Sequence, residues 1–525
     1  MIDRRLFSSA LLVAASFATA SGRAEVAITS FDQVRAEVQR YREVNESRTL
    51  RDFVEFLSIP NVSADKPNIA RNAQYLLAAL QKRDVEARLL ETADAAPAVY
   101  GELRSPGAKH TVVLYAHDDG QPVDATQWKT APFTPVLRDK QFEQGGAEIP
   151  LPASGPAAPE EARLYARSAS DDKAPIVAML TALDALRAAG VTPSVNLKFY
   201  FEGEEEAESL HLRPSLDHYR DLLKADAWIF CDGPVHQSRR MEVVYGARGV
   251  LPLDLTIYGP TRALHDGHYG NWAPNPAALL ATLLSSMRTP EGAVTIAGFS
   301  DGVRPIGEVE KKAIAQIPNV DPELRRSLGL ARTEAGDAPL VERILQPAMN
   351  IRGLFAGKVG AQAANAIPTE AKASIDFRLV PDQKTGAIRA AVERHLTGQG
   401  YFIVRAEPDL ETRLAHPRVI RVDWKEGYPG VRTAMDAPFS RAVGKVVQEA
   451  MGGTPIVHLP ILGGSVPLYV LQEVLGTPVV ILPIVNHDNN QHAANENLRL
   501  RNLRDGIDVF AAIFARLGSV WPASP

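Results

Sequence analysis

Residues 195–209 read VNLKFYFEGEEEAES, an apolar run followed directly by a cluster of carboxylates. The run VNLKFYF (195–201) predicts a buried strand. A solvated turn is the simplest explanation for the glutamates after it, which are Glu202, Glu204, Glu205, Glu206 and Glu208. Whether they form a site instead depends on what lies at the ends of the neighbouring strands.

The same strand belongs to an alternation of strands and helices that extends over about residues 30–245. TVVLYA (111–116) and DAWIF (226–230) are apolar runs typical of buried strands. KAPIVAMLTALDALRAAG (173–190) predicts a helix, with Gly190 at its C-terminal cap. The alternation indicates an α/β fold with a mixed, largely parallel sheet and helices on both faces. In such sheets ligands bind beyond the carboxyl ends of the strands.

Polar side chains stand at those ends. TVVLYA is followed by His117 and Asp119, DAWIF by Asp232, and Asp171 lies just before the long helix. Each residue has an ordinary structural role: a loop histidine, a turn or, for Asp171, a helix N-cap. Their joint placement favours a site. Asp119 points to the same side of an extended chain as His117, so it could orient the imidazole ring.

These residues suggest a metal centre. Two imidazoles with three carboxylates suit one or two zinc-like ions, whereas carboxylates alone would suit calcium or magnesium. The candidate ligands are His117, Asp171, Glu205 or Glu206, Asp232, and His487 or His492.

The pattern changes at about residue 246. Alternating strands and helices there predict a smaller α+β domain with an antiparallel sheet that is solvated on one face; its elements are expected at 251–259, 272–287, 372–380, 387–396 and 401–407. Buried strands return at 455–461 and 478–484, with a helix within 495–517. We therefore predict a catalytic domain in two segments, 25–245 and 432–525, interrupted by an inserted domain, 246–431.

The N-terminus resembles an export signal. Arg4 and Arg5 precede a short apolar stretch (6–20) that ends in Ala18-Thr19-Ala20, and Ala24 is a second candidate cleavage site. This predicts a signal peptide over residues 1–24, a periplasmic location after cleavage, and a partial match to a twin-arginine signal. A buried N-terminal helix is the alternative.

Composition excludes other classes. The 525 residues are 45% hydrophobic and 23% charged with a net charge of −5, so a general nucleic-acid binder is not expected. Outside the leader no apolar run approaches a membrane span. The single cysteine cannot form an internal disulfide.

Seven motifs, in order, resemble the two-zinc peptidase family that includes carnosinases, aminoacylases and glutamate carboxypeptidases. The motifs are YAHDDGQPVD (115–124), YARSASDDKAP (165–175), FEGEEEAES (201–209), CDGP (231–234), YGARG (245–249), ALHDGHYGNWAPNP (263–276) and NQHAANENL (490–498).

The resemblance implies a role for each candidate. It implies that His117 and Asp232 bind one metal, that Glu206 and His492 bind the other, that Asp171 bridges them and that Glu205 is the general base. Zinc is the first expectation, with manganese or cobalt as alternatives. His487 is then a loop residue, and Glu202, Glu204 and Glu208 keep the interpretation of a solvated turn.

The resemblance also implies substrate contacts. Arg378 matches the family's carboxylate-binding arginine, and Gly463-Gly464-Ser465, expected to begin a helix, could donate backbone N–H groups. His265, in the inserted domain, would stabilise the oxyanion of a partner subunit's site, which implies a homodimer through a lid and dimerisation domain.

The implied activity is hydrolysis of dipeptides or small peptides with a free C-terminal carboxylate. An N-acyl-amino-acid amidohydrolase and a catalytically silent metal-binding protein are the alternatives. The chain departs from the family's pattern at three places near the motifs: Ala166-Arg167-Ser168 replaces Gly-Arg-Gly, Asp118 replaces an aromatic residue, and the predicted surface loop 141–161 is long.

Overall fold

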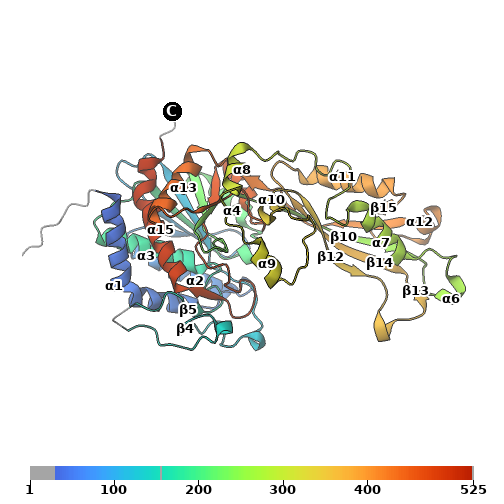
Figure 1. Cartoon of the computed structure of the whole chain (residues 1–525), viewed down its shortest axis with the longest axis horizontal. Coiled ribbons are helices and arrows are strands. Elements are labelled where there is room, and N and C mark those ends of the chain that lie inside the picture. The colour runs from blue at the N-terminus through green and yellow to red at the C-terminus, as the bar shows by residue number, and fades with distance from the viewer. Residues whose placement is uncertain (1–29, 154–156, 523–525) are drawn as a thin grey trace, which may run out of the picture.

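The computed structural model describes residues 30–153 and 157–522, and the predicted signal peptide lies outside these residues. Within the described part, no helix combines the length and apolar character that a membrane crossing requires. Figure 1 shows an α/β unit, built from both ends of the chain, and an elongated unit built from its middle.

The α/β unit is built on an eight-stranded sheet. Its central strands β6, β3, β7 and β19 run parallel to one another. At one edge, β2 is antiparallel to both of its neighbours, β6 and β1. At the other edge, β8 is antiparallel to β19 and parallel to β18. This confirms the predicted mixed, largely parallel sheet. In spatial order the strands are β1 (Glu86–Leu90), β2 (Ala98–Leu103), β6 (Asn196–Glu202), β3 (Thr111–His117), β7 (Ala227–Phe230), β19 (Val479–Ile481), β8 (Glu242–Val244) and β18 (Val457–Leu459).

Helices cover both faces of this sheet. Alternate residues of β3 divide between two apolar clusters, with Val112 and Leu114 in one and Val113 and Tyr115 in the other. Burial on both sides explains why the strands are continuous apolar runs in the sequence. One face packs against α1 (Phe31–Leu57), α2 (Lys66–Gln81), α3 (Lys173–Ala188), α13 (Pro438–Ala450) and α15 (Leu500–Val520), and the other against α4 (Leu212–His218), α5 (Arg220–Leu223) and α14 (Leu468–Leu475).

Local signals fix several helix ends. Gly190 follows α3 with a φ of 67°, the left-handed conformation that favours glycine, as predicted. The helix expected at 272–287 begins at Pro276 because the Asn275 side chain caps it and proline suits the first turn.

Two small sheets tie the segments together. In one, β20 (Asn497–Arg499) pairs with β5 (Arg163–Tyr165), which also pairs with β4 (Val136–Arg138). In the other, β9 (Gly246–Ala247) pairs with β17 (Val431–Arg432). The chain therefore enters and leaves the elongated unit side by side.

The elongated unit contains a five-stranded sheet covered on one face by α7 (Pro276–Met287) and α11 (Thr385–Gly398). The sheet is antiparallel as expected, except that its edge strand, which is shorter than the predicted 401–407, lies parallel to its neighbour. In spatial order the strands are β12 (Ala348–Phe355), β14 (Glu370–Leu379), β10 (Gly249–Tyr258), β16 (Val419–Trp424) and β15 (Phe402–Val404).

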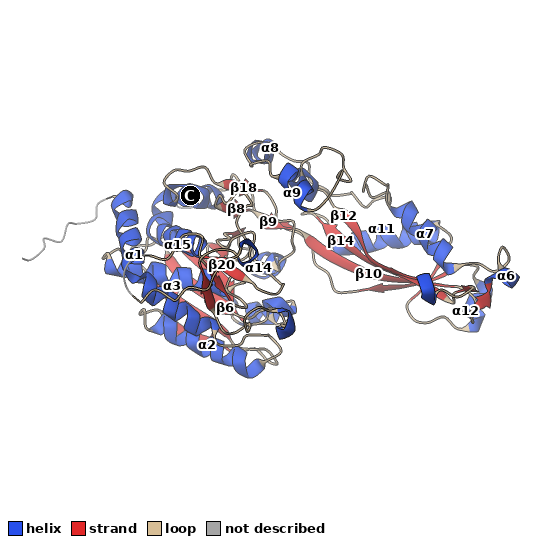
Figure 2. Ribbon diagram, turned by 60° about the horizontal axis from the view of Figure 1, so that its bottom comes forward, coloured by secondary structure: helices blue, strands red, loops and turns tan. Residues whose placement is uncertain are grey.

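Short elements lie at both ends of this unit. The tip far from the α/β unit carries α12 (Leu410–Ala415), α6 (Asp266–Tyr269) and the pair β11 (Leu264–His265) and β13 (Ala366–Ile367) (Figure 2). At the other end are α8 (Glu308–Ile314), α9 (Asp321–Ser327) and α10 (Leu340–Ile344), which the sequence pattern did not predict.

Candidate metal centre

Three parallel strands bring the candidate ligands to one edge of the sheet. His117 ends β3, Glu205 and Glu206 follow β6, and Asp232 follows β7. The other two candidate ligands come from outside these strands: Asp171 lies just before α3, and His492 lies in the loop before β20. Two groups of three side chains among the described residues could each hold a metal ion, because the ligand atoms within a group lie within 4.8 Å of one another. The first group is His117, Asp172 and Asp232, and the second is Asp171, Glu206 and His492.

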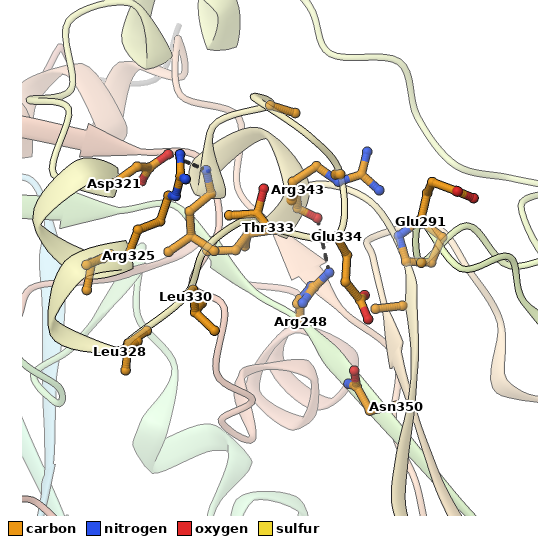
Figure 3. Close-up of a pocket in the computed structure, with 18 residues that line it drawn as sticks. Arg248, Glu291, Asp321, Arg325, Leu328, Leu330, Thr333, Glu334, Arg343 and Asn350 are labelled. Atoms are coloured by element: carbon orange, nitrogen blue, oxygen red, sulfur yellow. Dashed lines mark hydrogen bonds between the residues drawn. The ribbon is translucent and has the colours of Figure 1, made fainter.

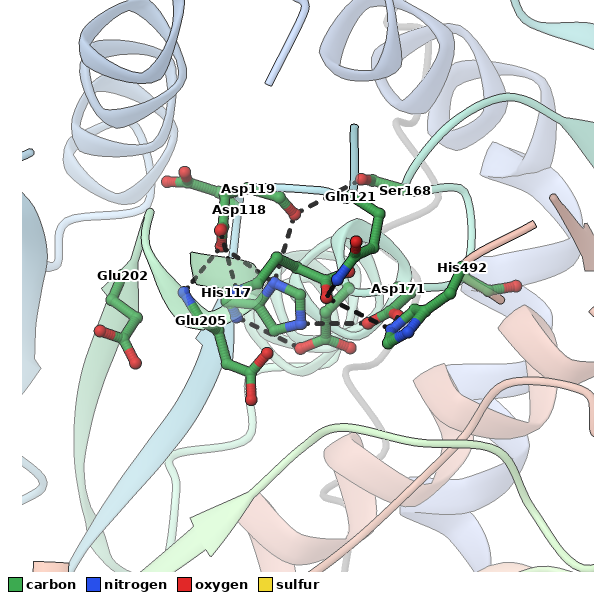
Figure 4. A network of polar contacts seen from close by, with 12 residues as sticks. His117, Asp118, Asp119, Gln121, Ser168, Asp171, Glu202, Glu205 and His492 are labelled. Atoms are coloured by element: carbon green, nitrogen blue, oxygen red, sulfur yellow. Dashed lines mark hydrogen bonds and ion pairs between the residues drawn. The ribbon is translucent and has the colours of Figure 1, made fainter. Parts of the chain in front are cut away.

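Asp171 lies between the two histidines. One of its carboxylate oxygens is 3.1 Å from His117 Nε2, and the other is 3.0 Å from His492 Nε2 (Figure 4). Burial alone would raise the pKa of Asp171, but the contacts with both imidazoles lower it below its usual value. A carboxylate with one oxygen toward each group has the placement that a bridging ligand requires.

Asp119 organises both sides of the centre. Its Oδ1 and its backbone oxygen each lie 3.2 Å from His117 Nδ1. Its two carboxylate oxygens also accept the backbone N–H groups of Glu205 (3.2 Å) and Glu206 (3.0 Å). One buried side chain therefore fixes the imidazole ring and the glutamate turn together.

The adjacent glutamates diverge. They lie in a single 3₁₀ turn, Glu205–Ala207. Glu206 belongs to the second ligand group, 3.3 Å from His492 Nε2, and accepts a 2.6 Å hydrogen bond from Gln121. Glu205 is outside both groups. Burial raises the pKa of Glu205 well above its usual value; His117 opposes this rise, and Asp232 adds to it.

Glu496, from the NEN motif, holds the loop that carries Asp171. It is fully buried and accepts hydrogen bonds from Arg167 Nη1 (2.7 Å) and from the backbone N–H groups of Ser168, Ser170 and Asp171 (2.9 Å each). The residue type alone gave no indication of this role.

Ser168 stands where the family has glycine, and its φ is 62°. That conformation is strained for a serine. The side chain is fully buried, and its hydroxyl accepts a 2.8 Å hydrogen bond from Asn61, which supports the conformation.

Two sequence interpretations need correction or addition. Glu202 is not part of a solvated turn: it is buried and accepts hydrogen bonds from Tyr115 and from Ser209 (2.9 Å). Asp172 was not predicted from the sequence; it is fully buried in the first ligand group, and one of its oxygens has no hydrogen-bond partner among the described residues. Its position next to Asp171 in the DDK string was the available signal.

The candidate substrate contacts partly come together. Arg378 donates to Ser465 Oγ (2.9 Å) and to Asp376 (2.6 Å), although the two segments belong to different units. The expected helix start at 463–465 is wrong, because α14 begins only at Leu468 and Gly464 lies in the preceding turn. Burial raises the pKa of Tyr428; Glu205 adds to the rise and Arg378 opposes it, so this phenol lies near both.

His265 does not reach the centre of its own chain. It lies in β11 beside α6, at the tip far from the α/β unit (Figure 2), and its side chain is 56% exposed. His487 is half-buried and belongs to neither ligand group.

The donor set fits two divalent cations. Imidazole nitrogens and carboxylate oxygens are the ligands that zinc prefers. Without a cation, burial raises the pKa of Glu206 to about 8 and that of Asp232 to about 6, with Asp171 adding to both shifts. Such a concentration of buried carboxylates requires compensating positive charge, and Asp172 supplies an oxygen that has no other partner.

Comparisons with known proteins agree with this geometry. Residues 113–516 match the model of peptidase family M20/M25/M40. The chain is 27% identical to the Cys-Gly metallodipeptidase of Schizosaccharomyces pombe, over 89% of this chain and 94% of the relative, and 26% identical to the Beta-Ala-His dipeptidase of Homo sapiens, over 81% and 78%. An M20 family metallo-carboxypeptidase from Sulfolobus solfataricus is similar in structure, with a TM-score of 0.72 and 27% identity over 90% of this chain and 99% of that one.

Proposed function

This chain belongs to peptidase family M20/M25/M40, and we propose that it hydrolyses the amide bond of dipeptides or small peptides that carry a free C-terminal carboxylate. The protein is a dinuclear-metal hydrolase of the metallodipeptidase type. The observation that carries the proposal is the division of the centre: two ligand groups meet at Asp171, and Glu205 remains outside both.

In this proposal His117 and Asp232 would hold one ion, Glu206 and His492 would hold the other, and Asp171 would bridge them. Asp172 lies close enough to add to the first group. The ions would be zinc, manganese or cobalt. When bound, they would lower the pKa of a water molecule and polarise the scissile carbonyl.

Glu205 is the general base in this assignment. Its carboxylate removes the proton from the attacking water and then gives it to the leaving amine. Asp119 holds the backbone of Glu205 and the ring of His117, so it positions the base relative to the ligands. His265 of a partner subunit supplies the oxyanion donor.

Arg378 and Ser465 form the carboxylate site in this proposal. Their mutual 2.9 Å hydrogen bond places a guanidinium and a hydroxyl together, and Gly464 lets the backbone approach the ligand. The same contact would hold an N-acyl amino acid. A panel of dipeptides and N-acetyl amino acids, assayed with the metal-loaded enzyme, tests the proposed substrate class.

Replacing Arg378 with alanine should raise KM for a dipeptide by about 10- to 100-fold, because a charge-assisted pair to the carboxylate is lost. The same substitution should leave hydrolysis of the corresponding dipeptide amide nearly unchanged. Arg71→Ala, at an exposed arginine on α2, is the matched control and should leave both KM values as they are. Equal losses for acid and amide substrates would contradict the assignment.

We propose a catalytic domain of residues 25–245 and 432–525, with a lid and dimerisation domain of residues 246–431. The adjacent strands β9 and β17 support this division, because both connections pass there. A homodimer through the inserted domain would bring His265 to the partner subunit's centre.

We also propose export to the periplasm with cleavage after Ala20 or Ala24. The supporting feature is the sequence of residues 1–24, which lies outside the described residues. Mass spectrometry of the N-terminus of periplasmic protein should find one of these two cleaved ends. Replacing Arg4 and Arg5 by lysine should block export if the twin-arginine route is used. Intact protein that remains wholly in the cytoplasm would contradict the proposal.

A further inference from the structure

Glu242, at the start of β8, is a buried carboxylate without a hydrogen-bond or ion-pair partner among residues 30–153 and 157–522. Its side chain is 3% exposed, one of its oxygens has no hydrogen-bond partner, and it forms no ion pair with any described residue. Burial alone raises the pKa of Glu242 to about 8, with no neighbouring charge contributing. Leaving such a group unpaired is costly, and the proposed mechanism does not use it.

This carboxylate lines a pocket of about 430 Å³. Apolar side chains form most of the walls, among them Val235, Ile317, Leu340 and Leu462. The polar lining includes two histidines, His236 and His487, and burial lowers the pKa of both. The pocket therefore combines an apolar wall with hydrogen-bond acceptors.

Apart from the two histidines, the ionisable side chains on the described lining are all acids. Besides Glu242, the carboxylates of Asp321 and Glu342 line the pocket, and no lysine or arginine does so among the residues that the structure describes. Asp321 accepts a hydrogen bond from Leu340 N (2.9 Å), and Glu342 is exposed. Glu242 is thus the buried acid that remains available to a ligand.

A neighbouring pocket carries cations as well as acids. It has a volume of about 370 Å³ and shares Asp321, Leu340 and Ile344 with the first pocket. Its lining includes three arginines, Arg248, Arg325 and Arg343, beside three carboxylates, Glu291, Asp321 and Glu334 (Figure 3). In that pocket Arg248 donates to the backbone oxygen of Gln346, and Arg325 donates to that of Ala331 (2.7 Å). The absence of lysine and arginine from the described lining of the Glu242 pocket is therefore a local feature.

One wall of the pocket lies close to the candidate metal centre, because Pro234, which lines the pocket, follows Asp232 by two residues. Phe230 pairs with Ile481, and Ile481 pairs with Val244. The bridge between Pro234 and Val485 continues the first register beyond the strand ends. Asp232 comes two residues after Phe230, and Glu242 comes two residues before Val244. Because β7 runs parallel and β8 antiparallel to β19, both residues lie at the same height, at the same edge of the sheet.

The strand order also sets the distance between Asp232 and Glu242. β19 lies between β7 and β8, and neighbouring strands are about 4.8 Å apart, so the two side chains start roughly 10 Å from one another. The α-ammonium of a bound dipeptide is too near the scissile bond to cover that span. A four-carbon lysine stem or an arginine side chain has suitable length.

We propose that the Glu242 pocket binds the ammonium or guanidinium group of a basic substrate residue, and so makes the enzyme selective for peptides that contain lysine or arginine. This rests on the proposed peptidase function. The apolar walls contact the methylene stem, and Glu242 pairs with the charge at its end.

The test compares lysine with norleucine, which has a similar length and no charge. For the metal-loaded enzyme, kcat/KM for Lys-Ala over norleucine-Ala, or for Ala-Lys over Ala-norleucine, should be about 10 to 100. If the Lys-Ala pair shows this ratio, the N-terminal residue of the substrate enters the pocket; if the Ala-Lys pair shows it, the C-terminal residue does. In Glu242→Gln the ratio should fall to about 1, while activity on Ala-Ala is retained. A ratio near 1 in the parent enzyme, or one that Glu242→Gln does not change, overturns the proposal.

Two controls separate pairing from other effects. Glu342→Gln removes the exposed acid of the same pocket and should change the ratio by less than about 3-fold because solvent screens it. If the lysine-to-norleucine ratio falls equally in Glu242→Gln and Glu342→Gln, the selectivity comes from the summed negative charge around the pocket and not from pairing with Glu242, and the proposal is overturned. Glu242→Leu should keep the melting temperature, since it removes an unpaired buried carboxyl.

Direct binding distinguishes this proposal from the proposed function. Calorimetry with n-pentylamine, which carries the lysine ammonium on an aliphatic chain, should show binding to the metal-loaded protein that is lost in Glu242→Gln. If no peptide is hydrolysed but the amine binds in this way, the peptidase function fails and the cation pocket stands. If Ala-Ala is hydrolysed but neither lysine preference nor amine binding depends on Glu242, the pocket fails and the peptidase function stands.

Discussion

Glu205→Gln should lower kcat/KM by about 10²- to 10⁴-fold while the protein still binds two metal ions. Glutamine keeps the shape of the side chain but cannot take a proton from water. Glu205 lies outside both ligand groups, so its loss should leave the metal content unchanged. Elemental analysis and turnover, measured on the same preparation, provide the test.

The neighbouring glutamates are the controls. Glu206→Gln should reduce both activity and metal content, because Glu206 shares a ligand group with Asp171 and His492. Glu208→Gln should behave like the parent enzyme, since this side chain is exposed on the same turn. If Glu205→Gln loses a metal and Glu206→Gln keeps both, the two roles are reversed.

Two inactive variants should regain activity when they are mixed. His265→Ala and Glu205→Gln are each expected to be inactive as homodimers. In a mixed dimer, one centre would combine an intact Glu205 with an intact His265 from the other subunit. The two subunits of such a dimer contain two centres, and symmetric pairing of this kind is the commonest oligomer form. Each mixed dimer should therefore have up to about half of the parent activity.

Two structural features support this arrangement. His265 lies at the tip of the inserted unit and not at its own centre. The edge strand β12 presents Leu354 and Phe355, which are 60% and 59% exposed, beside unpaired backbone groups. Exposed apolar edge strands favour pairing with a second chain.

The measurement needs evidence of subunit exchange, for example from two differently tagged chains. His268→Ala, which changes the next histidine of the same tip, should stay active and serves as the control for damage to the tip. Confirmed exchange without recovered activity would exclude a shared centre, and a monomer at assay concentration in sedimentation would do the same.

The fold was predictable where periodicity was strong. The runs at β3, β6 and β7 are apolar because both faces of the sheet are buried, and their lengths match the observed strands closely. The short helices α8, α9 and α10 were not predicted, because each has fewer than two full turns of useful pattern. The parallel pairing of β15 depends on contacts distant in sequence, which a local pattern does not contain.

The candidate site was predictable to a similar degree. The positions of His117 and Asp232 followed from strand ends and that of Asp171 from the start of the long helix. The resemblance to a family separated Glu205 from Glu206. Burial of Glu202 could not be read from a cluster of five glutamates, because it depends on the Tyr115 hydroxyl of the neighbouring strand.

The role of Glu496 has a consequence for biosynthesis. Its carboxylate holds the Asp171 loop through hydrogen bonds between residues 325–329 positions apart in the chain. Closing so long a loop is slow and entropically costly. While the ribosome is still adding residues before β19, the nascent chain lacks both Glu496 and His492 and has no complete metal centre. The metal centre can therefore form only after residues 492–496 have been synthesised and have packed against the Asp171 loop.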